Sequence, residues 1–247
     1  MQHITGDMER PLRSELATHW ALDPSTVFLN HGSFGATPNV IREEQRHWQD
    51  RMEHEPVAFL DGEGLEQMAV ARHALAQMLS CNPDDLALIE NATSGVNTVM
   101  RSLTFSEGDE ILVPDHAYQA CRNTIDFVAQ RWKAKVVTVP LPFPIEGPHV
   151  VMDAMLNAVT ERTVLAMIDT VTSPTGLRMP FEDLTSQLEA RGVSVLLDAA
   201  TASAWFRWTL TSSVPLTPPA TATNGFAPPR GQPSFTCAKT SKWTSIP

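Results

Sequence analysis

The sequence predicts an α/β fold in which a mainly parallel sheet lies between two layers of helices. Short apolar segments of strand length alternate with helical patterns through the middle of the chain. One segment, residues 193–200, is almost entirely apolar and contains a single carboxylate, Asp198. Buried strands of parallel sheets have this composition, and open α/β sheets bind ligands at the carboxyl ends of their strands. We therefore expect a three-layer sandwich with a ligand site near Asp198.

The order of the expected elements follows from the same alternation. Strands are expected at residues 86–89, 110–113, 135–139, 163–168 and 194–197. Helices are expected between them at residues 95–103, 118–132, 152–159 and 181–191. Gly192 follows the last helix and is the residue type that most often ends one. Each helix is thus expected to cross over one face of a parallel sheet.

The amino-terminal part is expected to form helices outside this alternation. A short helix is expected at residues 11–20 and a longer one at residues 38–52, where Thr37 and Pro38 suit the N-cap and first position. A further helix is expected at residues 65–79. The sequence therefore predicts three parts: a helical segment (1–60), a large but incomplete α/β domain (61–200), and a tail (201–247).

The tail differs in composition from the rest of the chain. Residues 1–200 hold all 28 acidic residues and 14 of the 18 basic ones, whereas residues 201–247 hold no acidic residue and seven prolines. The prolines predict an irregular tail without a long helix or a central strand. A disordered tail is one interpretation, but Trp205, Phe206, Trp208 and Trp243 are unusual for it, because disordered segments are poor in aromatic residues.

Charge and apolar patterning exclude some classes of protein. A net charge of −10 argues against a general nucleic-acid binder. No apolar run approaches the roughly 20 residues that span a bilayer, and the amino terminus lacks the pattern of a signal peptide. The three cysteines, Cys81, Cys121 and Cys237, are odd in number and far apart, which fits a reducing compartment. We expect a cytoplasmic protein.

Four stretches that follow expected strands contain residues suited to a ligand. Asn91-Ala92-Thr93 opens a helix, where backbone N–H groups favour a phosphate. The turn from His116 to Tyr118 offers aromatic rings that stack on a planar group. A third stretch contains Thr175 in a turn, and the fourth contains Asp198. Each stretch alone is also consistent with an ordinary helix cap or surface turn, and this is the simpler interpretation for the stretches that contain Thr93 and Thr175.

Other candidate sites are weaker. Gly62 and Gly64 lack the third glycine and the preceding strand of a dinucleotide-binding loop. The histidines near residue 50 lack the spacing of metal ligands, so no metal site is expected. Cys121 lies early in an expected helix, where a thiolate is somewhat favoured, but core packing is the simpler interpretation.

The stretches taken together, in this order, resemble a known family. Residues 28–36 (Phe-Leu-Asn-His-Gly-Ser-Phe-Gly-Ala), 91–93 (Asn-Ala-Thr), 116–118 (His-Ala-Tyr), 173–176 (Ser-Pro-Thr-Gly) and 197–200 (Leu-Asp-Ala-Ala) are similar to motifs of the class V aminotransferases. These are fold-type I enzymes that depend on pyridoxal 5'-phosphate (PLP), and the isopenicillin-N epimerase-like branch is the most similar. The resemblance covers about residues 25–200, and the set of motifs is far more specific than any single one.

The resemblance implies a role for each matching residue. Ala92 and Thr93 would hold the cofactor phosphate, and the turn from His116 to Tyr118 would supply the group that stacks on the ring. Asp198 would pair with the pyridine nitrogen, and Thr175 would be a weaker neighbour of the cofactor. The segment Asn30, His31 and Gly32 would lie on the substrate side.

The sequence departs from the family pattern at Thr201. The family has a histidine there and, roughly 25 residues after the acid, a His-Lys-Trp segment whose lysine forms a Schiff base with PLP. Lys242 precedes Trp243 but lies 44 residues after Asp198, so it is a poor match, and no catalytic lysine is identified. A reading frame shifted by one base would let residues 221–225 encode Asn-Cys-His-Lys-Trp. We therefore expect residues 201–247 to be out of frame and the family domain to be truncated.

The implied activity is epimerisation or transamination of an α-amino acid or an amino-acid-containing peptide. A cysteine desulfurase or sulfoxide lyase outcome is also open within the family. Without the lysine, the chain is expected to be inactive. Two other hypotheses remain: a non-catalytic fragment that pairs with an intact relative, since intact members are expected to be homodimers, and the product of a damaged gene.

Overall fold

The computed structural model describes residues 14–29, 35–201, 221–224 and 234–238, and for the last two ranges it describes only the backbone. A single sheet of seven strands has the order β1-β7-β6-β5-β4-β2-β3. Its strands are β1 (Leu86–Ile89), β2 (Glu110–Pro114), β3 (Lys135–Val139), β4 (Thr163–Asp169), β5 (Ser194–Asp198), β6 (Thr221–Asn224) and β7 (Ser234–Ala238). The strands from β6 through β5, β4 and β2 to β3 are parallel, and β7 pairs antiparallel with both β6 and β1.

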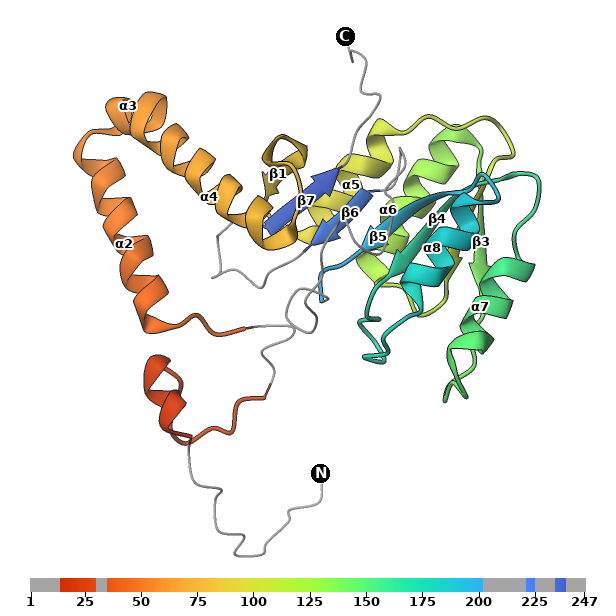
Figure 1. Ribbon diagram of the computed structural model, residues 1–247, viewed down its shortest axis with the longest axis horizontal. Coiled ribbons are helices and arrows are strands. Elements are labelled where there is room, and N and C mark those ends of the chain that lie inside the picture. The colour runs from red at the N-terminus through yellow and green to blue at the C-terminus, as the bar shows by residue number, and fades with distance from the viewer. Residues whose placement is uncertain (1–13, 30–34, 202–220, 225–233, 239–247) are drawn as a thin grey trace, which may run out of the picture.

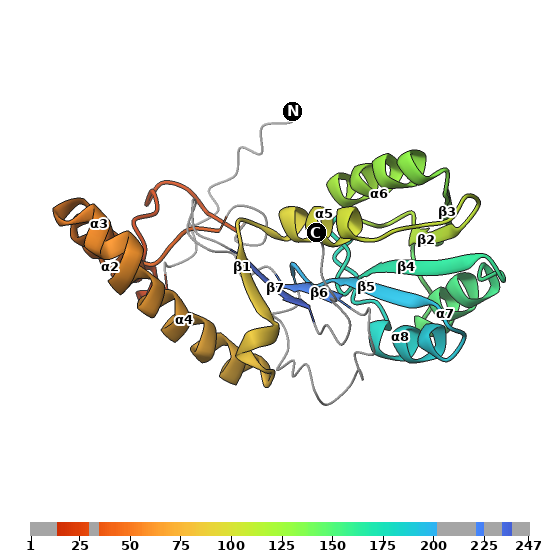
Figure 2. The same cartoon turned by 90° about the horizontal axis from the view of Figure 1, so that it is seen from above.

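Helices cover both faces of the sheet (Figures 1 and 2). One layer holds α5 (Ala92–Ser102) and α6 (Gln119–Trp132), and the other holds α7 (Pro148–Asn157) and α8 (Phe181–Glu189). The predicted three-layer α/β fold with a mainly parallel sheet is confirmed. The predicted start of α7 was four residues late, because Pro148 takes a first-turn position that needs no backbone N–H donor.

The two faces of the sheet carry separate cores. Alternate residues of β4 and β5 point to opposite faces. Leu165, Met167 and Leu196 pack with α5 and α6, whereas Ala166, Ile168 and Leu197 pack with α7 and α8. Asp198 follows Leu197, so its side chain is expected on the α5–α6 face. That face therefore carries the predicted site.

The helices that precede the sheet form an arm (Figure 1). After the 3-10 helix η1 (Glu15–His19), the arm consists of α2 (Asn39–His54), α3 (Pro56–Ala58), the π-helical segment η2 (Phe59–Glu63) and α4 (Gly64–Leu79), and the 3-10 helix η3 (Pro83–Asp85) leads into β1. Several large apolar side chains of the arm are exposed: Val40, Ile41, Val57, Leu60, Leu65, Met68 and Val70. Among the described residues, every helix is too short or too polar to cross a bilayer.

The prediction that no central strand follows residue 200 was wrong. Strands β6 and β7 lie inside the sheet, between β5 and β1. Both are short, at four and five residues, and neither contains proline. The prolines of the tail all fall outside the two strands, before, between and after them. The three-part division of the chain at residues 60 and 200 stays a prediction.

Candidate functional site

The site is built at the carboxyl edge of the sheet, where β4 and β5 end side by side. Asp169 and Asp198 are the last residues of these strands and are register partners. Register partners on adjacent parallel strands lie about 4.8 Å apart and point to the same face. Both side chains are buried, with 2% of Asp169 and 4% of Asp198 exposed. Two buried acidic residues thus lie side by side at the ends of adjacent strands.

Hydrogen bonds fix the orientation of Asp198. The thiol of Cys121, in the first turn of α6, donates to Oδ2 over 3.3 Å, and the backbone N–H of Ala200 donates to Oδ1 over 3.1 Å. The Asp198 carbonyl accepts from the backbone N–H of Thr170 at 2.8 Å and from its hydroxyl at 3.2 Å. Burial and the neighbouring Asp198 carboxylate raise the pKa of the Cys121 thiol, so it stays protonated and able to donate.

Asp169 has a different hydrogen-bond donor from those of Asp198. Its Oδ2 accepts a hydrogen bond from the backbone N–H of Tyr118 at 3.2 Å. Burial, and then the charge of Asp198, raise the pKa of the Asp169 carboxyl well above its usual range, and the Tyr118 hydrogen bond opposes this only in part. Removal from water disfavours the ionised form, and so does a like charge close by.

The turn between β2 and α6 borders the two acids. The Nδ1 atom of His116 lies 3.4 Å from the hydroxyl of Thr175, which in turn lies 2.6 Å from the hydroxyl of Thr172. The His116 ring also lies 6.2 Å from the ring of Phe143. Tyr118 is 43% exposed and is the N-cap residue of α6. The structure therefore brings His116 and Thr175 together, as the sequence predicted for one site.

The start of α5 is capped by a side chain. The side chain of Asn91 caps the helix, since its Oδ1 accepts from the backbone N–H of Ser94 at 2.8 Å. The Gly95 N–H bonds to the Asn91 carbonyl at 3.1 Å. The first N–H groups of a helix have no acceptor within it, so those of Ala92 and Thr93 remain for an anion. Helix α5 packs on α6 and lies against β6, β7 and β1.

Lysines of the described part lie at the other edge of the sheet. Lys135 begins β3 and its Nζ pairs with Glu110 at 3.0 Å, while Lys133 pairs with Glu107 at 3.2 Å. Strands of five residues are about 16 Å long, so neither amine reaches the carboxyl edge. Three of the predicted site residues, Asn30, His31 and Gly32, lie outside the described residues, as does Lys242.

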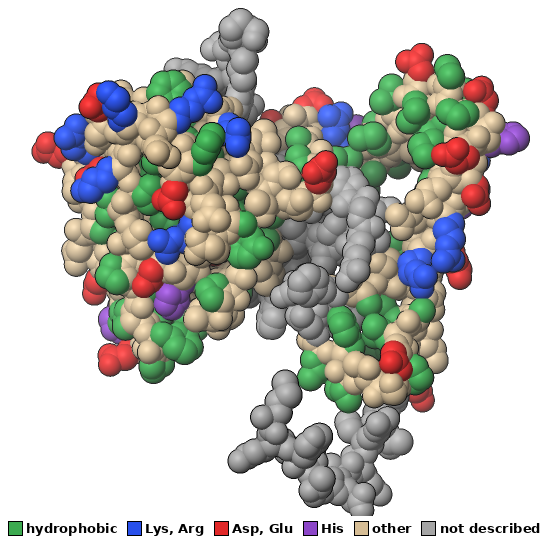
Figure 3. All heavy atoms as spheres, turned by 180° about the vertical axis from the view of Figure 1, so that it is seen from behind, with side chains coloured by type: hydrophobic (Ala, Val, Ile, Leu, Met, Phe, Trp, Pro, Cys, Tyr) green, Lys and Arg blue, Asp and Glu red, His purple; other side chains and the backbone are tan. Residues whose placement is uncertain are grey.

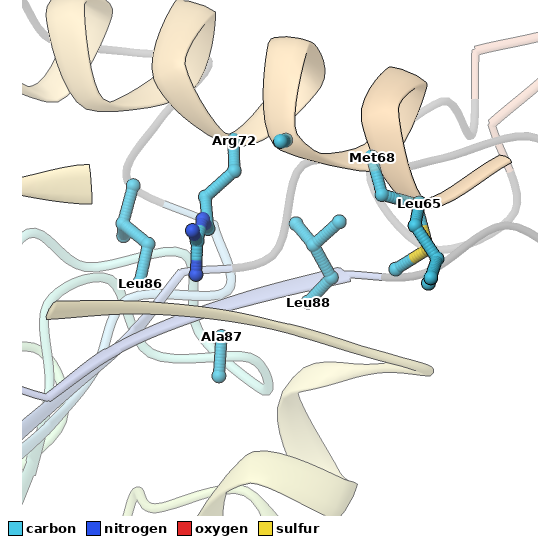
Figure 4. A pocket seen from close by; sticks show the side chains of 7 residues that line it. Leu65, Met68, Arg72, Leu86, Ala87 and Leu88 are labelled. Carbon is cyan, nitrogen blue, oxygen red and sulfur yellow. The ribbon is translucent and has the colours of Figure 1, made fainter. Parts of the chain in front are cut away.

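A cavity elsewhere lacks the groups for chemistry. It has a volume of about 360 Å³ and lies between α4 and β1 (Figure 4), with a lining of Leu65, Met68, Ala69, Arg72, Leu86, Ala87 and Leu88. Arg72 extends from α4 toward β1, and its Nε is buried without a hydrogen-bond partner. The lining contains no nucleophile and no acid. In the described ranges, no group of three His, Cys, Asp or Glu side chains is arranged to hold a metal ion.

Comparison with known sequences decides the family. The sequence model of the family described as "Aminotransferase class-V" matches residues 28–207, which include every described site residue. The chain belongs to the class V aminotransferase family. The match begins two residues before Asn30 and ends seven residues after Ala200, so it leaves out β6 and β7.

Relatives in this family include two kinds of named enzyme. Isopenicillin N epimerase of Streptomyces clavuligerus is 34% identical over 179 residues, which are 72% of this chain and 45% of the relative. L-cysteine desulfhydrase of Arabidopsis thaliana is 29% identical over 207 residues, which are 78% of this chain and 45% of the relative. The class V chain thus spans about half the length of the curated relatives it matches.

Solved structures share the fold. The cystine C–S lyase C-DES, in complex with its product cysteine persulfide, has a TM-score of 0.77 at 20% identity and covers 85% of this chain and 56% of its own. The cysteine desulfurase CsdA of Escherichia coli has a TM-score of 0.75 at 18% identity and covers 91% of this chain and 57% of its own. At these identities the likeness establishes the fold-type I architecture of the class V chain.

Two residues of the site were not assigned by sequence reasoning. Asp169 stands directly after an expected strand, as Asp198 does, and two strand-end acids in a parallel sheet are a usable signal. Their contact depends on β4 and β5 being neighbours, which the sequence does not reveal. Cys121 was interpreted as a core residue, and it is buried, but its thiol also bonds to Asp198.

Proposed function

We propose that this class V chain binds pyridoxal 5'-phosphate at the carboxyl edge of its sheet. The observation that carries the proposal is the buried Asp198 carboxylate, fixed by two donors at the end of β5 on the face that α5 and α6 cover. A carboxylate in this position suits a protonated pyridine nitrogen. The bound cofactor would supply an electron sink for a substrate carbanion.

The neighbouring residues fit the rest of the cofactor. The backbone N–H groups of Ala92 and Thr93, at the capped start of α5, suit its phosphate. In the turn from His116 to Tyr118, the His116 ring is the better candidate for stacking, because Thr175 and Phe143 hold it. Thr175 is thereby a neighbour of the cofactor, and Asn30, His31 and Gly32 are proposed for the substrate side.

The proposed substrate class is an α-amino acid or an amino-acid-containing peptide. Epimerisation is the first candidate reaction, because isopenicillin N epimerases are 34% identical to this chain. Carbon–sulfur lyase or desulfhydrase chemistry is the second candidate, because L-cysteine desulfhydrases are also relatives. Both reactions begin with removal of a proton beside the amino group, and the base that the family uses for this step is the Schiff-base lysine, which is not identified in this chain.

We further propose that the chain as written turns over little or no substrate. The described lysines, Lys133 and Lys135, are held at the opposite edge of the sheet. Asn224 stands 26 residues after Asp198, near the family spacing for the lysine. It ends β6 one residue beyond Thr223, the register partner of Asp198. Its backbone therefore occupies the edge where an anchoring amine is needed.

Titration with PLP, followed by absorbance and by quenching of tryptophan fluorescence, tests the binding proposal. We expect saturable binding by the full chain and binding about 10- to 100-fold weaker in Asp198→Asn, because hydrogen bonds to charged groups contribute about 1.5–3 kcal/mol. Asp126→Asn, an exposed change on α6, is the matched control and should bind as the parent does. Equal affinity in all three proteins would rule out the proposed role of Asp198.

Borohydride trapping tests the missing anchor. The parent chain with bound PLP should give no reduced lysine adduct by mass spectrometry, whereas Asn224→Lys should give one at residue 224. Thr223→Lys is the comparison at the neighbouring register position. A trapped lysine in the parent chain, together with turnover of an amino acid, would contradict the inactive assignment.

Partners and location are part of the proposal. We expect a cytoplasmic protein that pairs with a second copy or with an intact relative through the arm, whose apolar side chains are exposed. On the face in Figure 3, basic and acidic side chains are interspersed over the described residues, which gives no support to nucleic-acid binding. Light scattering coupled to size exclusion should show a dimer mass, and Leu60→Glu should reduce it to that of a monomer.

A further inference from the structure

Asp169 has no role in the proposed cofactor contacts, although it lies beside Asp198, which is proposed to bind the pyridine nitrogen. It is 2% exposed, and its register partner is Asp198. Its one hydrogen-bond donor is the Tyr118 N–H, and among the described residues it forms no ion pair with a lysine or an arginine. The protonation state of a buried acid with one neutral donor and an adjacent carboxyl group therefore needs an explanation.

Two buried carboxyl groups at register-paired positions disfavour joint ionisation. Adjacent parallel strands hold them about 4.8 Å apart at the backbone, and like charges in a buried site force one group to keep its proton. Donors decide which group is ionised. Asp198 accepts from the Cys121 thiol and the Ala200 N–H, whereas Asp169 accepts from Tyr118 alone. Because donors favour the ionised form, the negative charge belongs on Asp198.

We propose that Asp169 is a positioning residue that keeps a proton beside the Asp198 carboxylate, so that the pair carries one negative charge in total and directs it at a single cationic partner. Cys121 completes the arrangement as a neutral donor to Asp198. This inference rests on the proposed function for the identity of the partner, the pyridine nitrogen of PLP. The protonation of the pair itself is a property of the chain without cofactor.

Among the described residues, the groups near the pair are Cys121 from α6, Tyr118 and His116 from the turn before it, and the hydroxyls of Thr170, Thr172 and Thr175 after β4. The opposite face of β4 and β5 is lined by apolar side chains of α7 and α8. His116 bonds to Thr175 and lies 3.9 Å from Asp115, so its nearest acid is not a member of the pair.

Infrared spectroscopy of the full chain without PLP, with ¹³C-labelled aspartate, tests the proton directly. At pH 7 we expect the carbonyl band of one protonated aspartate in the parent. The band should vanish in Asp169→Asn and persist in Asp126→Asn. In Asp198→Asn it should titrate away at lower pH, because the like charge is gone. Absence of the band in the parent, or its survival in Asp169→Asn, would overturn the proposal.

Cys121 gives a second readout. Cys121→Ala removes a donor from Asp198 and should weaken PLP binding about fivefold, whereas Cys121→Ser keeps a donor and should restore most of the affinity. Equal loss in both variants would contradict the donor role. The two experiments distinguish failure of this inference from failure of the proposed function. The infrared band without PLP binding would support the protonated Asp169 and contradict the cofactor proposal. Asp198-dependent PLP binding without the band would support the cofactor proposal and contradict the protonated Asp169.

Discussion

The pKa values of buried acids are shifted in opposite directions at the two edges of the sheet. At the amino edge, Glu110 accepts from the Thr160 hydroxyl at 2.7 Å and pairs with Lys135 at 3.0 Å, and these hydrogen bonds hold its pKa below the usual range. At the carboxyl edge, Asp169 lies beside a second acid, and its pKa is raised. The amino edge has its counter-charge in Lys135, whereas we propose that a bound cofactor supplies the cation at the carboxyl edge.

A negative charge added to each edge should show which one binds the cofactor. Thr93→Glu places a carboxylate at the start of α5, where it repels the phosphate, and like-charge contact costs several kcal/mol, so PLP binding should fall by about 100-fold or more. Ser106→Glu adds the same charge to an exposed loop at the amino edge and should leave binding unchanged. A similar loss in both variants would mean that the effect is general electrostatics.

The two acids should also give stability opposite dependences on pH. The folded state binds more protons than the unfolded state above the ordinary aspartate pKa of about 4, up to the raised pKa of Asp169, so Asp169 lowers stability as pH rises through that window. Glu110 has a lowered pKa, so its contribution is present above about pH 4.5 and is lost as pH falls through its folded pKa.

Thermal unfolding from pH 3 to pH 8 measures both effects. Asp169→Asn should gain stability over the parent between pH 5 and pH 8, by about 1.4 kcal/mol for each unit of pKa shift removed. Glu110→Gln should lose stability at neutral pH and approach the parent at pH 3. If both variants change the slope of the unfolding free energy against pH in the same direction, the two acids do not have opposite pKa shifts.

Thiol reactivity is a third way to test the carboxyl edge. The raised pKa and burial of Cys121 predict alkylation by iodoacetamide at least about tenfold slower than at the half-buried Cys81. Peptide mapping after timed labelling distinguishes the two sites. If Cys121 is the faster of the two, its thiol does not remain protonated against Asp198.

Loss of the α5 cap should have the smallest effect. Asn91→Ala removes the acceptor for the Ser94 N–H and should reduce the free energy of unfolding by about 1 kcal/mol, whereas Asn91→Asp should keep the cap. Chemical denaturation of both variants checks this. A destabilised Asn91→Asp would show that the side chain acts by something other than capping.

Sequence reasoning predicted the elements of this fold well wherever pattern and local signals agree. Alternation placed all five strands up to residue 200, and Gly192, at a φ of +78°, lies in the turn that follows the last helix. The same reasoning missed β6 and β7, because β6 has no large apolar residue and no helical pattern separates the two strands. Both strands form by pairing with each other and with β5 and β1.

The site divides in the same way. Motifs at strand ends predicted Thr93, His116, Thr175 and Asp198 as site residues, because parallel strands bring their carboxyl ends to one edge, and their roles toward a cofactor stay a prediction. The contact of Asp169 with Asp198, and the bond from Cys121, require knowledge of which strands and helices are neighbours. These contacts depend on the tertiary structure, and no local sequence pattern predicts them.

The most direct measurement is the ¹⁵N NMR spectrum of PLP labelled at the pyridine nitrogen and bound to the full chain. We expect the chemical shift of a protonated nitrogen in the parent at neutral pH and the shift of a neutral pyridine in Asp198→Asn. A neutral pyridine shift in the parent, or the same shift in both proteins, would contradict the claim that the buried acid of β5 receives the cofactor.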